Sequence, residues 1–154
     1  MARAPFQVLV FPFMIVNNHD IVYAVFKRSD NGIWQAVAGG GEDDETAPEA
    51  ARREAAEEGG IHSDRIIELD SRFAVPAVEE SGMLWGAEIL VLPEYCFGIE
   101  VTDKNLNLSD EHDIFRWLNY DDARTILHWD SNKNALWELN YRLRRFLEGS
   151  SENV

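Results

Sequence analysis

The sequence predicts a single α/β domain, in which amphipathic helices cover a β-sheet. Residues 21–26 (IVYAVF) have the pattern of a strand, and residues 30–32 (DNG) behind them are typical of a turn between two strands. Residues 132–147 place Leu136, Leu139, Leu143 and Phe146, with Trp137, on one apolar helical face. A second helix, at 47–58, has clear limits at both ends. Strands and helices therefore follow one another along the chain.

The expected elements fill most of the chain. We expect strands near 6–16, 21–27, 34–38, 66–75, 86–98 and 113–118. We expect helices at 47–58, 121–128 and 132–147. With 154 residues and 45% hydrophobic content the chain can bury a core, and no Pro, Gly or Ser tract divides it. One domain is expected at 1–148, followed by a frayed tail at 149–154.

Composition excludes several classes of partner. A formal net charge of -14 repels polyanions and argues against a protein that binds nucleic acid polymers. The apolar run at 6–16 is too short to span a bilayer, so we expect a buried strand and no membrane partner. The single Cys96 permits no internal disulfide, which indicates a reduced core residue of a cytoplasmic protein. The oligomeric state stays open, with a homodimer as one alternative.

The limits of the helix at 47–58 follow from its end residues. Thr46 followed three residues later by Glu49 is a capping box. Pro48 lies in the first turn, where its missing amide proton costs nothing. Gly59 and Gly60 supply the left-handed stop.

Three carboxylates crowd one stripe of this helix. Glu54, Glu57 and Glu58 stand at i, i+3 and i+4, where like charges repel by about 0.2 to 0.5 kcal/mol per pair. A bound cation reverses this cost, and hard oxygen ligands without Cys or His indicate Mg²⁺, with Mn²⁺ as a substitute. Arg53 is placed to hold a carboxylate rotamer. Replacing Glu57 or Glu58 by Gln should then leave stability without metal equal or higher.

A solvated, Glu-rich surface helix is the simpler explanation of the carboxylates alone, but a longer pattern surrounds them. Five residues separate Gly39 from Glu45, and seven more separate Glu45 from the segment REAAEEGGI at 53–61. This pattern resembles the complete motif of the Nudix hydrolases. The glycines at 39–41 are expected to form a flexible loop that brings backbone groups to an ion and to phosphates.

The resemblance implies a fold, an activity and roles. Nudix enzymes share an α/β/α sandwich around a mixed sheet and hydrolyse nucleoside diphosphates linked to another moiety, using Mg²⁺ or Mn²⁺. By position, Glu54, Glu57 and Glu58 would bind metal, with the Gly39 carbonyl as a further ligand. Arg53 would form a supporting ion pair with Glu45.

The reaction also needs a group that accepts a proton from the attacking water. Glu111, in the polar segment SDEHDIFRWL before an expected strand, is the best candidate outside the motif helix. An ordinary exposed loop acid is the alternative interpretation, and Glu58 is the competing base. Glu79, Glu80 and Glu100 are weaker candidates.

The C-terminal half of the sequence resembles one group within the Nudix hydrolases. SDEHDIFRWL and the later SNKNALWEL at 131–139 resemble the bacterial dihydroneopterin triphosphate pyrophosphatases, also described as dATP pyrophosphohydrolases. The resemblance extends upstream through residues 27–40. In that group the acid matching Glu111 would join the metal site.

Few cations and several aromatic residues could hold a substrate. Lys27 and Arg28, at the end of an expected strand, are candidate phosphate clamps, and Arg3 is a third candidate; solvent-facing charge is the alternative. Buried packing is the alternative for each aromatic residue. The candidates for stacking on a planar ring are Trp34, Phe73 and Trp85.

The sequence therefore predicts a Mg²⁺-dependent pyrophosphohydrolase for a small-molecule triphosphate. Dihydroneopterin triphosphate or dATP would be cleaved to a monophosphate and pyrophosphate. Dinucleoside polyphosphates, nucleotide sugars and oxidised nucleotides are alternative substrates. A nucleotide-sensing Nudix module without turnover is the alternative from a different class.

Overall fold

The computed structural model describes residues 2–77 and 84–152, with side chains as far as residue 149. Its strands are β1 (Arg3–Val16), β2 (Asp20–Arg28), β3 (Trp34–Gln35), β4 (Val37–Glu42), β5 (Ile66–Pro76), β6 (Val91–Glu100) and β7 (His112–Leu118). Its helices are α1 (Ala47–Gly59), α3 (Tyr120–Ile126) and α4 (Asp130–Glu152). None of these helices, in the described residues, is long and apolar enough to cross a membrane.

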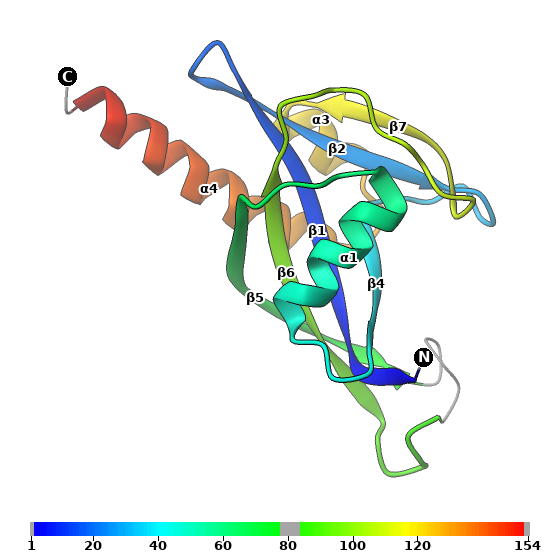
Figure 1. Ribbon diagram of the computed structural model, residues 1–154. Coiled ribbons are helices and arrows are strands. Elements are labelled where there is room, and N and C mark those ends of the chain that lie inside the picture. The colour runs from blue at the N-terminus through cyan, green and yellow to red at the C-terminus, as the bar shows by residue number, and fades with distance from the viewer. Residues whose placement is uncertain (1, 78–83, 153–154) are drawn as a thin grey trace.

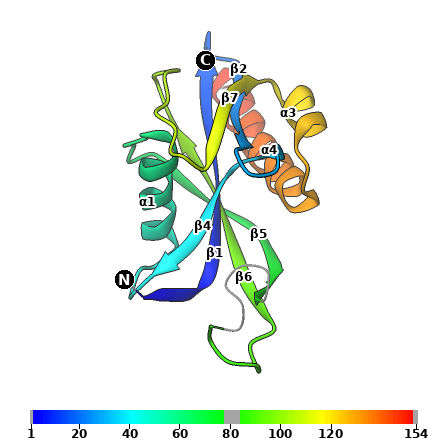
Figure 2. The ribbon, with the colours of Figure 1, turned by 90° about the vertical axis from the view of Figure 1, so that its right-hand side faces the viewer.

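The strands form one mixed sheet between two helical layers. Its order is β3-β2-β1-β6-β5, while β4 pairs with β1 and β7 pairs with β2. β1 runs parallel to β6, and its pairs with β2 and β4 are antiparallel. α1 covers one side of the sheet, and α3 and α4 lie on the other (Figures 1 and 2). The predicted α/β/α sandwich with a mixed sheet is confirmed.

β1 is buried on both faces because it lies at the centre of the sheet. Leu9 and Phe11 pack in the core on the side of α4, while Val8 and Val10 pack in the core on the side of α1. This alternation is the two-residue period of a strand. It explains why residues 6–16 are apolar almost without interruption.

α4 packs closely on β6 through its leucines. A Cβ atom added at Gly98 of β6 would stand 2.6 Å from a methyl carbon of Leu139, so glycine lets the helix approach. Leu136, Leu139 and Leu143 are buried, as the sequence predicts. The expectation that Trp137 and Phe146 complete this face is wrong, since they are 55% and 65% exposed.

The glycine segment 39–41 is not a loop. It belongs to β4, and Gly39 and Gly40 stand opposite Val8 and Gln7 of β1. A Cβ atom at Gly40 would lie 2.5 Å from the Arg3 guanidinium, and one at Gly41 would lie 2.2 Å from the Phe6 ring. The glycines are required because side chains press against the strand, and the expected strand at 34–38 is divided between β3 and β4.

The largest remaining differences from the expected boundaries are in β6 and α4. β6 begins at Val91, whereas the expected strand began at 86. α4 continues to Glu152, five residues past its expected end at 147, and so includes part of the expected tail. The assignment of one domain at 1–148 stays a prediction.

The close packing of α4 gives a test of the core. Leu139→Ala should lower the free energy of unfolding by about 2 to 5 kcal/mol, because it leaves a cavity against β6. Trp137→Ala, on the exposed face of the same helix, should change it by no more than about 0.5 kcal/mol. Urea denaturation measures both. Equal losses would contradict this packing.

Candidate functional site

α1 begins and ends where its sequence predicts. The Thr46 hydroxyl accepts a hydrogen bond from the Glu49 amide (3.3 Å), and the Glu49 carboxylate accepts one from the Thr46 amide (2.9 Å). Gly60 ends the helix with φ of 66°, a left-handed conformation that favours glycine. These caps fix the turns of α1 and thus the direction of its carboxylates.

The three carboxylates of α1 converge. One oxygen each from Glu54, Glu57 and Glu58 lies within 4.8 Å of the others. Glu54 and Glu58 are buried and Glu57 is exposed, so the group opens to solvent on one side. An all-oxygen donor set of this kind fits a hard divalent cation.

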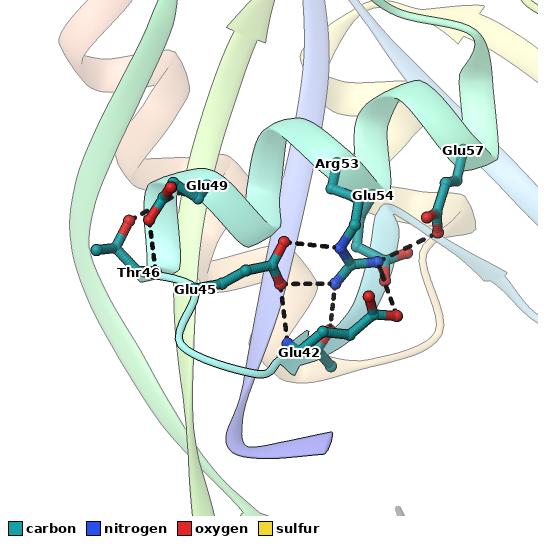
Figure 3. A network of polar contacts seen from close by, with 8 residues as sticks. Glu42, Glu45, Thr46, Glu49, Arg53, Glu54 and Glu57 are labelled. Carbon is teal, nitrogen blue, oxygen red and sulfur yellow. Dashed lines mark hydrogen bonds and ion pairs between the residues drawn. The ribbon is translucent and has the colours of Figure 1, made fainter. Parts of the chain in front are cut away.

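Arg53 connects two of these acids, Glu54 and Glu57, to the rest of the fold (Figure 3). Its Nε and Nη2 donate to the two oxygens of Glu45 at 2.9 and 3.1 Å. Its Nη1 donates to Glu54 at 2.9 Å and to Glu57 at 3.2 Å, and its Nη2 donates to the Gly40 carbonyl at 2.7 Å. The Arg53–Glu45 pair expected from the sequence is therefore present. These bonds, led by that to Glu45, raise the pKa of Arg53.

Glu54 is the most strongly perturbed acid of this group. Burial raises its pKa to about 7, against the opposing effect of Arg53. A Cβ atom at Gly39 would stand 2.2 to 2.5 Å from the Glu54 carboxylate, so only glycine leaves room for it. The neighbouring hydrogen bonds orient the Gln7 side-chain amide: its nitrogen donates to the Gly39 carbonyl at 2.9 Å, and its oxygen accepts from Arg3 Nη2 at 3.0 Å. Gln7 is thus a neighbour of this carbonyl that the sequence did not reveal.

Glu58 is stabilised in its charged form. Burial would raise its pKa, but His112 and Ser109 outweigh burial, so the pKa is lowered. The Ser109 hydroxyl donates to the Glu58 carboxylate, and His112 Nδ1 lies 3.4 Å from the same oxygen. The gain in stability expected for Glu58→Gln does not follow from these contacts. The larger electrostatic cost in this group is the desolvation of Glu54, which raises its pKa, whereas the contacts of Glu58 lower the pKa of Glu58.

Glu111 lies in the turn before β7, as the sequence predicts, and lines the same cavity as the α1 acids. Burial and then the negative charge of Glu58 raise its pKa. Of the weaker candidates, Glu79 and Glu80 lie outside the described residues. Glu100 accepts a bond from Arg65 at 2.8 Å.

The carboxylates form one side of a cavity of about 720 Å³. Arg3 and Arg28 also line it. Both nitrogens of the Arg28 fork donate to Asp30 at 2.9 Å, so Arg28 lies at the cavity with its guanidinium already oriented. The remaining lining residues that matter for a ligand with a ring are Phe73, Trp129 and Asn132.

Two expected substrate residues lie elsewhere. The described lining of the cavity includes neither Lys27 nor Trp34. They stand directly opposite each other in the β2–β3 register and so share one face of the sheet, while Arg28 follows on the other. The Trp34 ring packs against the core and under the Arg116 guanidinium, 5.0 Å away. Of the other aromatic candidates, Phe73 lines the cavity, and Trp85 donates to the Arg3 carbonyl at 3.2 Å.

Trp129 and Asn132 were missed by sequence reasoning. Trp129 is 46% exposed directly before α4. Asn132 is buried, and its side-chain oxygen accepts a bond from the Ala36 amide at 2.8 Å. Only the long-range contact between the start of α4 and the β3–β4 junction brings these residues to the cavity.

Comparison with known proteins places the chain in a family. Residues 8–138 match the NUDIX domain, and the chain belongs to the Nudix family. It is a hydrolase of the class that acts on phosphoanhydride bonds. The rat protein named bis(5'-nucleosyl)-tetraphosphatase [asymmetrical] (Rattus norvegicus) is 28% identical over 130 residues, which are 80% of this chain and 81% of that protein.

Solved structures share the fold. A crystal structure from Listeria monocytogenes, described as that of a NUDIX hydrolase, is 43% identical with a TM-score of 0.83, over 92% of this chain and 96% of that one. The E. coli dihydroneopterin triphosphate pyrophosphohydrolase is 22% identical with a TM-score of 0.66, over 91% and 99% of the two chains. The second likeness shows the fold alone.

The raised pKa of Glu54 gives a pH dependence for the metal-free protein. Because the folded state holds this proton more tightly than the unfolded state, the contribution of Glu54 to stability should fall as the pH rises from about 4.5 through 7. At pH 8, Glu54→Gln should be more stable than the wild type by roughly 1 to 3 kcal/mol. The difference should vanish near pH 4.

Thermal and urea unfolding in EDTA across this pH range measure the effect. Asp44→Asn, which alters an exposed acid just before α1, is the control and should follow the wild type. A constant difference between wild type and Glu54→Gln at every pH would refute the electrostatic explanation.

Proposed function

We propose that this protein is a Mg²⁺-dependent pyrophosphohydrolase that cleaves a triphosphate carrying a planar ring into a monophosphate and pyrophosphate. One observation carries the proposal. The carboxylates Glu54, Glu57 and Glu58 share a single cavity with the aromatic residues Phe73 and Trp129. Such a cavity can hold the phosphates at one end and a ring at the other.

The residues around the carboxylates fit a divalent cation. Glu54, Glu57 and Glu58 would hold Mg²⁺, or Mn²⁺ as a substitute, with the Gly39 carbonyl and Glu111 as further ligands. The cation would supply positive charge that neutralises the phosphoryl oxygens. Strong desolvation of Glu54 is consistent with this, because a nearby cation favours the charged carboxylate.

The remaining polar residues would orient the reacting groups. Arg53 fixes the rotamers of Glu54 and Glu57 through its two bonds from Nη1. Glu111, whose pKa is raised, would accept the proton of the attacking water, with Glu58 as the alternative base. Arg28 and Arg3 would bind phosphate oxygens from the cavity wall.

The ring would bind between aromatic residues far from the carboxylates in sequence. Phe73 is half-buried on β5, and Trp129 exposes nearly half its surface at the start of α4. Stacking on such side chains is worth about 1 to 3 kcal/mol per base. Asn132 lines the same cavity and would contribute polar contacts.

Dihydroneopterin triphosphate or dATP is the substrate type we favour, in line with the sequence resemblance and with the activity for which the E. coli structure is named. The rat relative supports dinucleoside polyphosphates as a second candidate. Products separate them, because only the first type releases pyrophosphate and a nucleoside or pterin monophosphate. Nucleotide sugars and oxidised nucleotides remain further alternatives.

The cellular location and the oligomeric state remain predictions. A cytoplasmic location agrees with the buried, free thiol of Cys96. A homodimer remains one alternative for the assembly. A sensing module without turnover would have no need of the three motif carboxylates, which supports an active enzyme.

The metal assignment is tested by a single carboxylate. Glu57→Gln should lower kcat for dATP by about 100-fold or more, because one anionic ligand of the cation is lost. Asp44→Asn should retain wild-type turnover, and EDTA should abolish turnover in both. Pyrophosphate release measures the rates. Wild-type turnover in Glu57→Gln would rule out its role.

The ring site is tested by two exposed tryptophans. Trp129→Ala should raise KM for dATP about tenfold through lost stacking, with little change in kcat. Trp137→Ala removes an equally large ring from α4 but away from this cavity, and should leave KM unchanged. Steady-state kinetics decide. Equal effects of the two substitutions would place the ring elsewhere.

A further inference from the structure

β5 contains a bulge before the segment that reaches the cavity. Three residues of β5 (69–71) stand opposite Cys96 alone on β6, so the register shifts by two residues. A bulge of this kind leaves backbone amides without a partner in the neighbouring strand. The bulge of β5 therefore needs another group to hold it.

Glu138 of α4 supplies that group. The amides of Asp70 and Ser71 donate to its two carboxylate oxygens at 2.7 Å each, and the Ser71 hydroxyl donates at 2.5 Å. The Glu138 side chain is 14% exposed. Burial would raise its pKa, but the bonds from Ser71 and Asp70 outweigh burial and lower it. The carboxylate is thus held charged against the bulge.

Arg142 closes the arrangement. Its Nε donates to Glu138 at 2.8 Å, one turn earlier on α4, and its Nη2 lies 3.0 Å from the Asp70 carboxylate. Helix and bulge are thereby joined through both backbone and side-chain groups. Neither Glu138 nor Arg142 is among the described residues that line the cavity.

The bulge decides which side chains form one wall of the cavity. Directly after it, residues 73–76 of β5 line the cavity, and Phe73 stands opposite Glu94, which lines it too. Without the bulge, each residue of this segment would move along β6 by two positions, about 6.6 Å. The same sheet face would remain exposed, but a different side chain would meet the ring.

We propose that Glu138 is a positioning residue for substrate selection. By fixing the bulge of β5 it sets the place of Phe73, and so the affinity for the ring of the substrate, without touching the substrate. The role in ring binding rests on the proposed function. The role of Glu138 in holding the bulge is independent of that function.

The test compares Glu138→Ala and Glu138→Gln with Glu148→Ala, which removes an exposed acid from the same helix. Calorimetry with Mn²⁺ measures the affinity for α,β-methylene dATP, in which the bond that the proposed reaction cleaves is replaced, and for inorganic tripolyphosphate, which lacks a ring. Glu138→Ala should lower the affinity for the analogue about tenfold and change the affinity for tripolyphosphate by less than about twofold. Glu138→Gln keeps one acceptor oxygen and should fall between, whereas Glu148→Ala should match the wild type.

Hydrogen exchange provides a readout that does not depend on the substrate. The amides at 70–73 should exchange faster in Glu138→Ala than in Glu148→Ala, with α1 unchanged. The inference would be overturned if Glu138→Ala lowered the affinity for both ligands equally, or if a folded variant kept the wild-type affinity for the analogue. Unchanged exchange at these amides would overturn it too. If the wild type binds neither ligand and releases no pyrophosphate from dATP, the proposed function fails instead. Faster exchange at 70–73 would then show that Glu138 still fixes the bulge.

Discussion

The desolvation of the crowded carboxylates of α1, above all of Glu54, is the constraint on which the site depends. Glu54, Glu57 and Glu58 converge on one side of a short helix, and Glu54 is desolvated enough to hold its proton near neutral pH. Arg53 binds two of them and ties them to Glu45 and to the backbone of β4. Arg53 thus orders these carboxylates but does not neutralise all of their negative charge, which favours cation binding over a purely structural role.

Close approach of backbone and side chains completes the site. β4 can pass beneath the carboxylates only because glycine stands opposite Glu54 at position 39. The same strand pairs with β1, which also carries Arg3 and Gln7 to the cavity. Elsewhere in the lining, residues of β5 reach the cavity after a bulge that Glu138 of α4 binds. The proposed phosphate end and the proposed ring end of the cavity are therefore held by different elements.

Local patterns predicted the polar contacts of α1, whereas tertiary contacts decide which aromatic residues line the cavity. The capping box, the i, i+3, i+4 carboxylates and the Arg53–Glu45 pair all lie within a 17-residue stretch of sequence, 42–58, and the structure contains them. The glycines at 39–41 were expected as a loop because glycine is common in turns, yet their role is to admit neighbouring side chains. Trp34 was a reasonable stacking residue by type, but its strand register turns it into the core. No local pattern relates Trp129 to Phe73.

The central claim is that the acids of α1 hold a divalent cation together with a triphosphate. The most direct measurement is calorimetric titration of Mn²⁺ into metal-free protein that is saturated with a methylene-bridged triphosphate, with Mg²⁺ as competitor. The account predicts saturable uptake of Mn²⁺ that Mg²⁺ displaces, and loss of this uptake when Glu54, Glu57 and Glu58 are replaced together by Gln. Absence of uptake by the wild type, or unchanged uptake by the triple variant, would contradict it.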